Sequence, residues 1–417
     1  MACLSFVLSG AAPSDTHVEY ARVTPTTPAP IENRARLDLV DLGRGAIMAL
    51  MALDHTRTYL TNVAYAPTDL TRTFPALFFT RWTSQYCTPL FLFLAGIGAA
   101  FAAARRTPPS TAWWLVTRGV VLIVLEMTAV RWGWYFNLDY AHTSPQILWA
   151  IGVSMILLAP LVWLPAPAVG AIGVVVMMVH NAIGPWFPTG ADAPWLWALL
   201  YERGHAFTIG GRVFLVNFPP LPLFGLMAAG YGFAGVLRQP DTERRRTLVV
   251  TGVAMSVLFV LLRTFNIYGE HTPWAPQADL AHSVMSYFSL TKQPLSLLMA
   301  LATIGPALIW WGMVDAGRAI WRPLVVIGRV PMFFYLMHVP LIHAIAVALS
   351  LWRYGDATWL FTSPYDRPVG FVLPADWGFG LPGVYVWTLV VLVTLYPVCR
   401  WYADLKSRSR SVVLSYL

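Results

Sequence analysis

The sequence predicts an all-α protein, a bundle of about ten membrane-spanning helices, and three observations support this class. Of the 417 residues, 57% are hydrophobic and only 12% are charged, whereas soluble domains carry about a quarter charged residues. The mean hydropathy is +0.59. The chain has 19 tryptophans, which suits a protein whose aromatic rings lie at two membrane–water interfaces.

Ten segments are long and apolar enough to be spanning helices, because a helix needs about 20 mostly apolar residues to cross the hydrocarbon core. They are residues 37–60, 74–104, 112–132, 145–163, 167–183, 213–237, 247–265, 291–314, 324–352 and 383–402. A short break, LPAPA at 164–168, separates the fourth segment from the fifth.

The basic residues predict the orientation of the bundle, because cytoplasmic loops are enriched in Lys and Arg. With a cytoplasmic amino terminus, the segments expected inside hold Arg22, Arg34, Arg36, Arg105, Arg106, Arg238, Arg244, Arg245, Arg246, Arg318, Arg322, Lys406, Arg408 and Arg410. The segments expected outside hold fewer: Arg72, Arg203, Arg212, Arg353 and Arg367. Both termini are therefore expected in the cytoplasm.

Three regions are expected along the chain: a disordered cytoplasmic tail (1–33) that includes the Pro/Thr-rich VTPTTPAPIE, the membrane domain (34–402) and a basic cytoplasmic tail (403–417). The net charge of +8 is dispersed among apolar segments, so we expect it to set topology and not to bind nucleic acid. Cys3, Cys87 and Cys399 lie far apart, and neither a disulfide nor a metal site is expected.

Ionisable residues inside a membrane are costly and indicate functional sites. The first segment contains RGAIMALMALDHTR, from Arg44 to Arg57. Arg44 and His55 are eleven residues apart, close to three helical turns, and so share one face about 16 Å apart along the axis. Asp41 precedes Arg44 by one turn, and an Asp41–Arg44 ion pair is the structural alternative. Asp54 adjoins His55 near the outer end.

Other segments bring polar residues to the same outer half, which predicts a pocket that opens outward. These residues are Arg81 and Gln85 in the second segment, Glu126 in the third, Lys292 in the eighth and His338 in the ninth. For His180, His343 and Arg131 we favour a structural role. The cytoplasmic ends supply Arg44, Arg118 and Arg329, a cationic mouth that suits either a phosphate-bearing ligand or the anionic lipids of the inner leaflet.

The segments RLDLVDLGRGAIMALMALDHTRTYL and FPALFFTRWTSQYCTPLFLFLAGIGAAF resemble the bacterial branch of the heparan-α-glucosaminide N-acetyltransferase catalytic-domain family. LTKQPLSLLMALATIGPALIWW and GRVPMFFYLMHVPLIHAIA resemble the same branch, so the resemblance covers roughly 34–402. The opening Asp41, Arg44, Gly45 and the run Pro89 to Gly96 are its most specific parts. The Arg44–His55 spacing is also similar to the signature of the membrane acyltransferase-3 family.

The resemblance implies an integral membrane acyltransferase in the bacterial inner membrane. Acyl-CoA, most simply acetyl-CoA, would enter from the cytoplasm as a co-substrate, and the acyl group would reach a sugar or lipid-linked glycan outside. No tightly bound cofactor is expected, and a homodimer is left open. By position, Arg44 with Asp41, Arg118 and Arg329 would lie near the CoA path, and Arg81 and Gln85 near the acceptor. His55 would be the catalytic histidine, whereas the animal lysosomal enzyme has its histidine in the following loop.

Several roles stay open at this stage. His55 would act either as the base or as an acyl carrier, because histidine titrates near working pH. Either Asp54 or Glu126 would orient it, and Lys292, Arg81 or His338 would stabilise the oxyanion. The alternative function is a carrier or flippase whose intramembrane charges form a relay.

Overall fold

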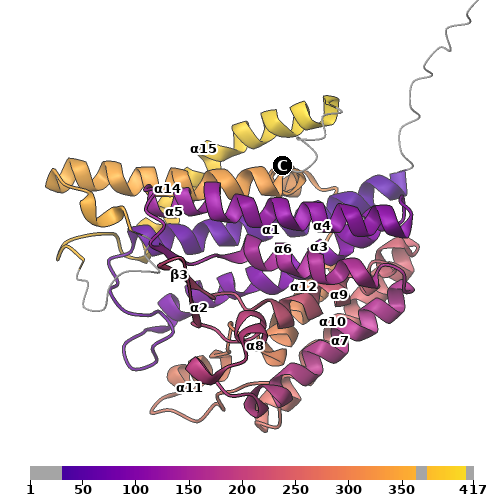
Figure 1. Ribbon diagram of the computed structural model, residues 1–417. Helices are drawn as coiled ribbons and strands as arrows, with labels where there is room; N and C mark the ends of the chain where they lie inside the picture. The colour runs from indigo at the N-terminus through magenta and orange to yellow at the C-terminus, as the bar shows by residue number, and fades with distance from the viewer. Residues whose placement is uncertain (1–30, 363–372, 410–417) are drawn as a thin grey trace, which may run out of the picture.

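The computed structural model describes residues 31–362 and 373–409 and is mostly helical. Figure 1 shows long helices packed alongside one another, with α1 (Ile31–Leu60) running between two ends of the bundle. The short elements β3 (Arg212–Leu215), α8 (Trp195–Leu200) and α11 (Leu280–Phe288) gather at the end where α1 finishes (Figure 1). The expected tail at 1–33 lies almost wholly outside the described residues, and so does most of the tail at 403–417.

The remaining helices follow the predicted order. They are α2 (Pro75–Thr83), α3 (Cys87–Ala103), α4 (Pro108–Leu125), α5 (Arg131–Tyr135), α6 (Ile147–Leu158), α7 (Ala166–Ile183), α9 (Pro220–Phe233), α10 (Asp241–Thr264), α12 (Leu297–Met313), α13 (Arg322–Arg329), α14 (Pro331–Tyr354) and α15 (Leu381–Arg408). A 3₁₀ turn at Ser84–Tyr86 joins α2 to α3, and a π-helical turn at Glu126–Val130 joins α4 to α5.

Within the described ranges, seven helices are long and apolar enough to cross a membrane. They span Pro75–Ala103, Pro108–Tyr135, Ala166–Trp186, Pro220–Arg238, Asp241–Thr264, Pro331–Tyr354 and Leu381–Arg408. Two shorter apolar helices, Ile147–Leu161 and Leu297–Met313, and the charged 30-residue α1 occupy the other predicted segments. The all-α polytopic class is confirmed, while the number of crossings and the side of each terminus stay predictions.

Three predicted segments differ from the single helices that the sequence predicts for them. The segment 324–352 is two helices, because Val330 leaves the helix (φ −129°, ψ 50°) before Pro331, and a proline disfavours helical backbone at the preceding residue. The segment 213–237 starts as a strand, and its helix begins at Pro220. The helix of 291–314 begins at Leu297, where the Ser296 side chain accepts a hydrogen bond from the Met299 N–H.

A small sheet, which the sequence analysis did not predict, joins the connection between α5 and α6 to the connection before α9. β1 (His142–Thr143) pairs in parallel with β3, and β2 (Ala206–Ile209) pairs antiparallel with β3. The two-residue turn between β2 and β3 consists of Gly210 and Gly211, at φ 58° and 75°. Positive φ at both positions is what a tight hairpin turn requires, and only glycine adopts it freely.

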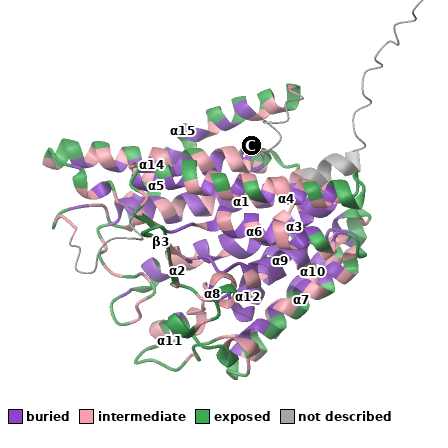
Figure 2. Cartoon of the chain, viewed as in Figure 1, coloured by how far each residue is buried: buried purple, intermediate pink, exposed green. Residues whose placement is uncertain are grey.

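Buried residues gather inside the bundle, and exposed residues lie on the outer helices and the loops (Figure 2). Many of the exposed residues of the outer helices are apolar. Most residues of α3 and α12 are buried. By contrast, α7, α10 and α15 expose apolar residues, among them Val175, Met178, Val250, Val257, Val386 and Val393. An apolar outer surface around a packed interior is the pattern expected where lipid contacts the helices.

α1 packs against α3, α13, α14 and α15. Its crossing with α13 is a backbone-to-backbone contact, since a Cβ at Gly45 would overlap the Leu324 carbonyl and one at Gly328 would overlap the Asp41 carbonyl. Small residues at helix crossings allow this close approach in membrane proteins. The contact brings Arg329 to the face of α1 that carries Arg44.

Candidate functional site

Two cavities lie along α1 inside the bundle, and we name them by their characteristic residues. The arginine cavity, of about 310 Å³, includes Arg44 and Met48 in its lining. The histidine cavity, of about 170 Å³, includes Met51 and His55. One stripe of α1 therefore contributes to both cavities, as its helical spacing predicts.

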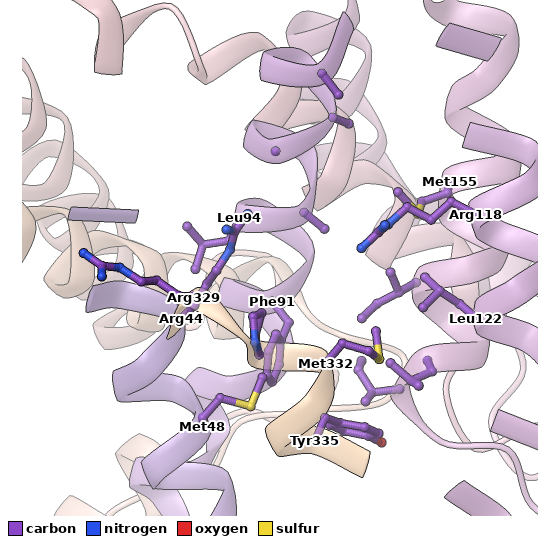
Figure 3. Close-up of a pocket in the computed structure, with 18 of the residues that line it drawn as sticks. Arg44, Met48, Phe91, Leu94, Arg118, Leu122, Met155, Arg329, Met332 and Tyr335 are labelled. Carbon is purple, nitrogen blue, oxygen red and sulfur yellow. The ribbon is translucent and has the colours of Figure 1, made fainter. Parts of the chain in front are cut away.

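The arginine cavity has a cationic part and an apolar part. Arg44, Arg118, Arg329 and Lys406 supply its charge, from α1, α4, α13 and α15. Figure 3 shows Arg44 and Arg118 on opposite walls, with side chains such as Met48, Leu122 and Met332 between the helices. The apolar lining includes Leu94, Ile151 and Met155. A charged mouth that leads into an apolar lumen suits an amphipathic, anionic ligand.

Two aspartates partly neutralise the arginines of this cavity. Arg44 Nη1 lies 3.4 Å from Asp41 Oδ1, and Arg329 Nη2 lies 3.0 Å from Asp38 Oδ1. The Asp41–Arg44 ion pair, which was the structural alternative for these two residues, is thus present, and Arg44 also lines the cavity. Arg118 stacks over the Trp114 ring, 5.6 Å from its centroid.

The histidine cavity is polar and gathers residues distant in sequence. Its lining includes Asp54 and His55 from α1, Arg81 from α2, Lys292 from the turn before α12, and Arg203 from the connection before β2. Ser84, Thr88, Gln146, Asn217 and Gln293 add further polar groups. Phe91, Ile147 and Tyr335 line both cavities, so the two meet at these three side chains.

His55 is hydrogen-bonded to His338, since His55 Nδ1 lies 2.8 Å from His338 Nε2. The other ring nitrogen of His338, Nδ1, lies 2.7 Å from the Tyr335 carbonyl oxygen and 3.1 Å from that of Phe334. A carbonyl oxygen only accepts, so Nδ1 of His338 carries a proton. In a neutral His338, Nε2 then accepts the Nδ1–H of His55, and Nε2 of His55 keeps a lone pair.

Asp54 does not orient His55 in this structure, because two arginines occupy its carboxylate. Oδ1 accepts a hydrogen bond from Arg57 Nη2 at 3.0 Å, and Oδ2 accepts one from Arg81 Nη1 at 3.1 Å. Adjacent residues on a helix point about 100° apart, which places Asp54 toward α2 while His55 faces α14. Arg81 also donates to Ser84 Oγ at 2.6 Å.

Glu126 does not orient His55 either. Its Oε2 accepts the Leu148 backbone N–H at 3.0 Å, at the first turn of α6, and its side chain is buried. A carboxylate is stabilised at a helix amino terminus by free N–H groups and the helix dipole. Glu126 therefore fixes the start of α6, whose Ile147 lies between the two cavities.

The other predicted site residues are divided between the cavities and the packed interior. The linings formed by the described residues include Arg81 and Lys292, whereas Gln85 is buried in the turn after α2. His343 Nε2 lies 2.9 Å from the Leu360 carbonyl oxygen, and His180 lies against Tyr201. Arg131 binds the backbone of Asn137 and Asp139. These last three have structural partners, in agreement with the role we favoured.

Sequence reasoning missed several residues of both cavities. From the sequence, Arg203 and Lys406 were interpreted only as basic residues that set topology, although each lines a cavity. Asn217 follows β3, and Tyr335 lies one turn before His338 on α14. Helical spacing could have predicted that Tyr335 lies on the same face of α14 as His338. The position of Arg203 depends on the sheet, which the sequence did not predict.

A polytopic helical bundle with an apolar outer surface is an integral membrane protein, and this one holds two internal cavities lined by polar and charged side chains. The chain belongs to the heparan-α-glucosaminide N-acetyltransferase catalytic family, whose sequence profile matches residues 36–273, more than half of its length. This family indicates a membrane acetyltransferase. The match includes Arg44, His55 and Arg203 and ends before Lys292 and His338. No curated protein matches the chain in a sequence comparison.

Proposed function

We propose that this protein transfers an acyl group, most simply acetyl, from cytoplasmic acyl-CoA to a sugar or glycan acceptor on the outer face of the membrane. The observation that carries the proposal is the junction of the two cavities at Phe91, Ile147 and Tyr335. On one side of it lie basic side chains suited to phosphates, and on the other lies His55.

The donor would bind in the arginine cavity. Its phosphates would contact Arg44, Arg118, Arg329 and Lys406, since guanidinium groups bind phosphate through paired hydrogen bonds. Its long arm, which carries the thioester, would follow the lumen beside Met48 and Leu94. Arg44 and His55 are separated by about 16 Å along α1, so the thioester would reach the junction while the phosphates stay at the mouth.

The acyl transfer would take place at His55. As the base, Nε2 of His55 takes the proton of the acceptor as the acceptor atom attacks the thioester carbonyl carbon. The carbon–sulfur bond then breaks, and His55 returns the proton to the CoA thiolate. Lys292 or Arg81 would stabilise the oxyanion between these steps. In the alternative form of the mechanism, His55 itself carries the acyl group before the acceptor takes it.

The proposal predicts that His55→Ala strongly reduces acyl transfer. Positioned bases contribute about 10² to 10⁴ in rate, so acetyl-CoA turnover by the detergent-purified variant should fall at least about 100-fold. The measurement is release of the CoA thiol. His282→Gln is the matched control, because His282 lies on α11 and pairs with Asp279 outside both cavities.

Two results would contradict this assignment. Undiminished turnover in a folded His55→Ala variant would remove His55 from the reaction. If acetyl-CoA neither binds the wild-type protein nor raises its thermal stability, the donor cavity is wrongly assigned. Transport of a solute without CoA consumption would then favour the carrier or flippase reading.

A further inference from the structure

The histidine cavity carries more positive than negative charge. Arg81, Arg203 and Lys292 line it, and Asp54 is the acidic residue in the same lining. Both oxygens of the Asp54 carboxylate are already bound, one by Arg81 and one by Arg57. The charge of Asp54 is therefore shared between two arginines and does not balance the other two cations.

Arg203 and Lys292 are the cations that remain. In the described ranges 31–362 and 373–409, neither forms an ion pair with an acidic residue. Arg203 interacts with the like charge of Arg81, and Lys292 interacts with Arg81 and Arg57 as well as with Asp54. Arg203 is exposed at the cavity, whereas Lys292 is half-buried. The repulsion between like charges therefore costs most at Lys292, and a bound anion would offset it.

The oxyanion of the transfer reaction does not account for all of this charge. One oxyanion develops at the thioester carbonyl, and one cation suffices to pair with it. Arg203 comes from the connection before β2, and Lys292 from the turn before α12, so the cations approach from different walls. The arrangement thus provides positive charge for a second anionic group within the same cavity.

The charge also distinguishes between two classes of acceptor. A sugar amine is protonated at neutral pH and would bring another positive charge to Arg81, Arg203 and Lys292. A sugar hydroxyl is neutral, and Ser84, Gln146 and Asn217 offer it hydrogen-bonding partners in the same lining. An acceptor that combines a hydroxyl with a phosphate or carboxylate matches both features.

We propose that the acceptor is an anionic hydroxyl compound, a sugar that carries a phosphate or carboxylate, and that Arg203 and Lys292 bind the anionic group. This inference rests on the proposed function and deepens it, because it makes the reaction an O-acylation. The hydroxyl oxygen forms the new ester bond to the acyl carbon, the carbon–sulfur bond breaks, and the hydroxyl proton passes through His55 to the CoA thiolate. The products are an ester and free CoA thiol.

The experiment compares four acceptors with the purified protein and acetyl-CoA at pH 7: glucose, glucose 1-phosphate, glucuronate and glucosamine. We expect kcat/KM for at least one of the two anionic sugars to exceed that for glucose about tenfold or more, with glucosamine the poorest. The phosphate and the carboxylate arms show which anion the cavity prefers. Binding of the four sugars without acetyl-CoA is measured in parallel.

Arg203→Gln tests the residue, and Arg212→Gln is its matched control from the exposed start of β3. A charge-assisted hydrogen bond contributes enough for about a tenfold change, so Arg203→Gln should raise the KM for the anionic acceptor about tenfold. The KM for glucose should rise much less than the KM for the anionic acceptor, and Arg212→Gln should behave as the wild type. High salt should weaken anionic acceptors selectively.

Several results would overturn the inference without touching the proposed function. One is that glucosamine is acylated faster than the other sugars. Another is that Arg203→Gln and Arg212→Gln have equal effects. A third is that Arg203→Gln raises the KM for acetyl-CoA and leaves the KM for the acceptor unchanged. Absence of binding by both anionic sugars would also overturn it. Failure of the proposed function would give a different result from failure of this inference. In that case His55→Ala would release CoA at the wild-type rate with every acceptor and with water.

Discussion

At the scale of single residues, the imidazole of His55 is positioned by a second imidazole and not by a carboxylate. A carboxylate partner would stabilise the charged form of His55 after it takes a proton. A neutral His338 instead fixes the orientation and the tautomer while adding little stabilisation to the charged form. With Lys292 and Arg81 in the same lining, a protonated His55 would return its proton readily to the departing thiolate.

His338 is therefore predicted to be a positioning residue. His338→Leu removes the acceptor for the Nδ1–H of His55, so kcat should fall about 100-fold, comparable to the loss of an orienting partner in catalytic triads. The KM for acetyl-CoA should change by less than about twofold. His338→Gln places an amide oxygen near the position of Nε2 and should recover much of the lost rate.

Steady-state kinetics on the two variants, with thermal unfolding as a check of folding, decide this point. A packing role would lower stability in both variants alike and would show no difference in kcat between Gln and Leu. If His338→Leu keeps full kcat, the hydrogen bond between the two imidazoles has no part in the reaction.

At the scale of helices and loops, hydropathy and helical spacing predicted most of the fold. The stripe from Arg44 to His55 follows from 3.6 residues per turn, and each end of it lies on a cavity. The break at Val330 was missed, although Pro331 signals it locally. The partners of Asp54 and Glu126 depend on how α2 and α6 approach, and one helix's periodicity carries no information on its neighbours.

The crossing of α1 and α13 gives a prediction for an element. Gly328→Ala places a Cβ against the Asp41 carbonyl, which forces the two backbones apart. Overpacking of this kind costs about 1–3 kcal/mol, so the unfolding temperature in detergent should fall. The KM for acetyl-CoA should rise, because Arg329 moves away from Arg44.

Gly235→Ala is the matched control, since a Cβ there meets no described atom within 4 Å. Its unfolding temperature and its KM should stay at the wild-type values. Equal unfolding temperatures for the two alanine variants would show that the helix crossing tolerates a side chain, and the argument from close packing would fail.

At the scale of the whole molecule, the proposed function assigns the donor to the arginine cavity and the acceptor to the histidine cavity. Arg44 lies near the middle of α1 (Ile31–Leu60), and His55 lies three turns further toward its end. The sheet, α8 and α11 gather at the end of the bundle where α1 finishes (Figure 1). An acyl-CoA donor is confined to the cytoplasm, so the proposed reaction requires the arginine cavity to open there. The same orientation is what the distribution of Lys and Arg predicts from sequence.

Two exposed alanines test this orientation without altering any charge. Ala64 follows α1, and Ala104 follows α3 at the other end of the bundle. In a Cys3→Ser background, Cys87 and Cys399 remain, and both are buried. A membrane-impermeant maleimide should label Ala64→Cys in intact cells and Ala104→Cys only after permeabilisation. The reverse pattern would place the arginine cavity outside, where no acyl-CoA reaches it, and would contradict the proposed direction of transfer. The roles of the residues around His55 would still be tested by their own variants.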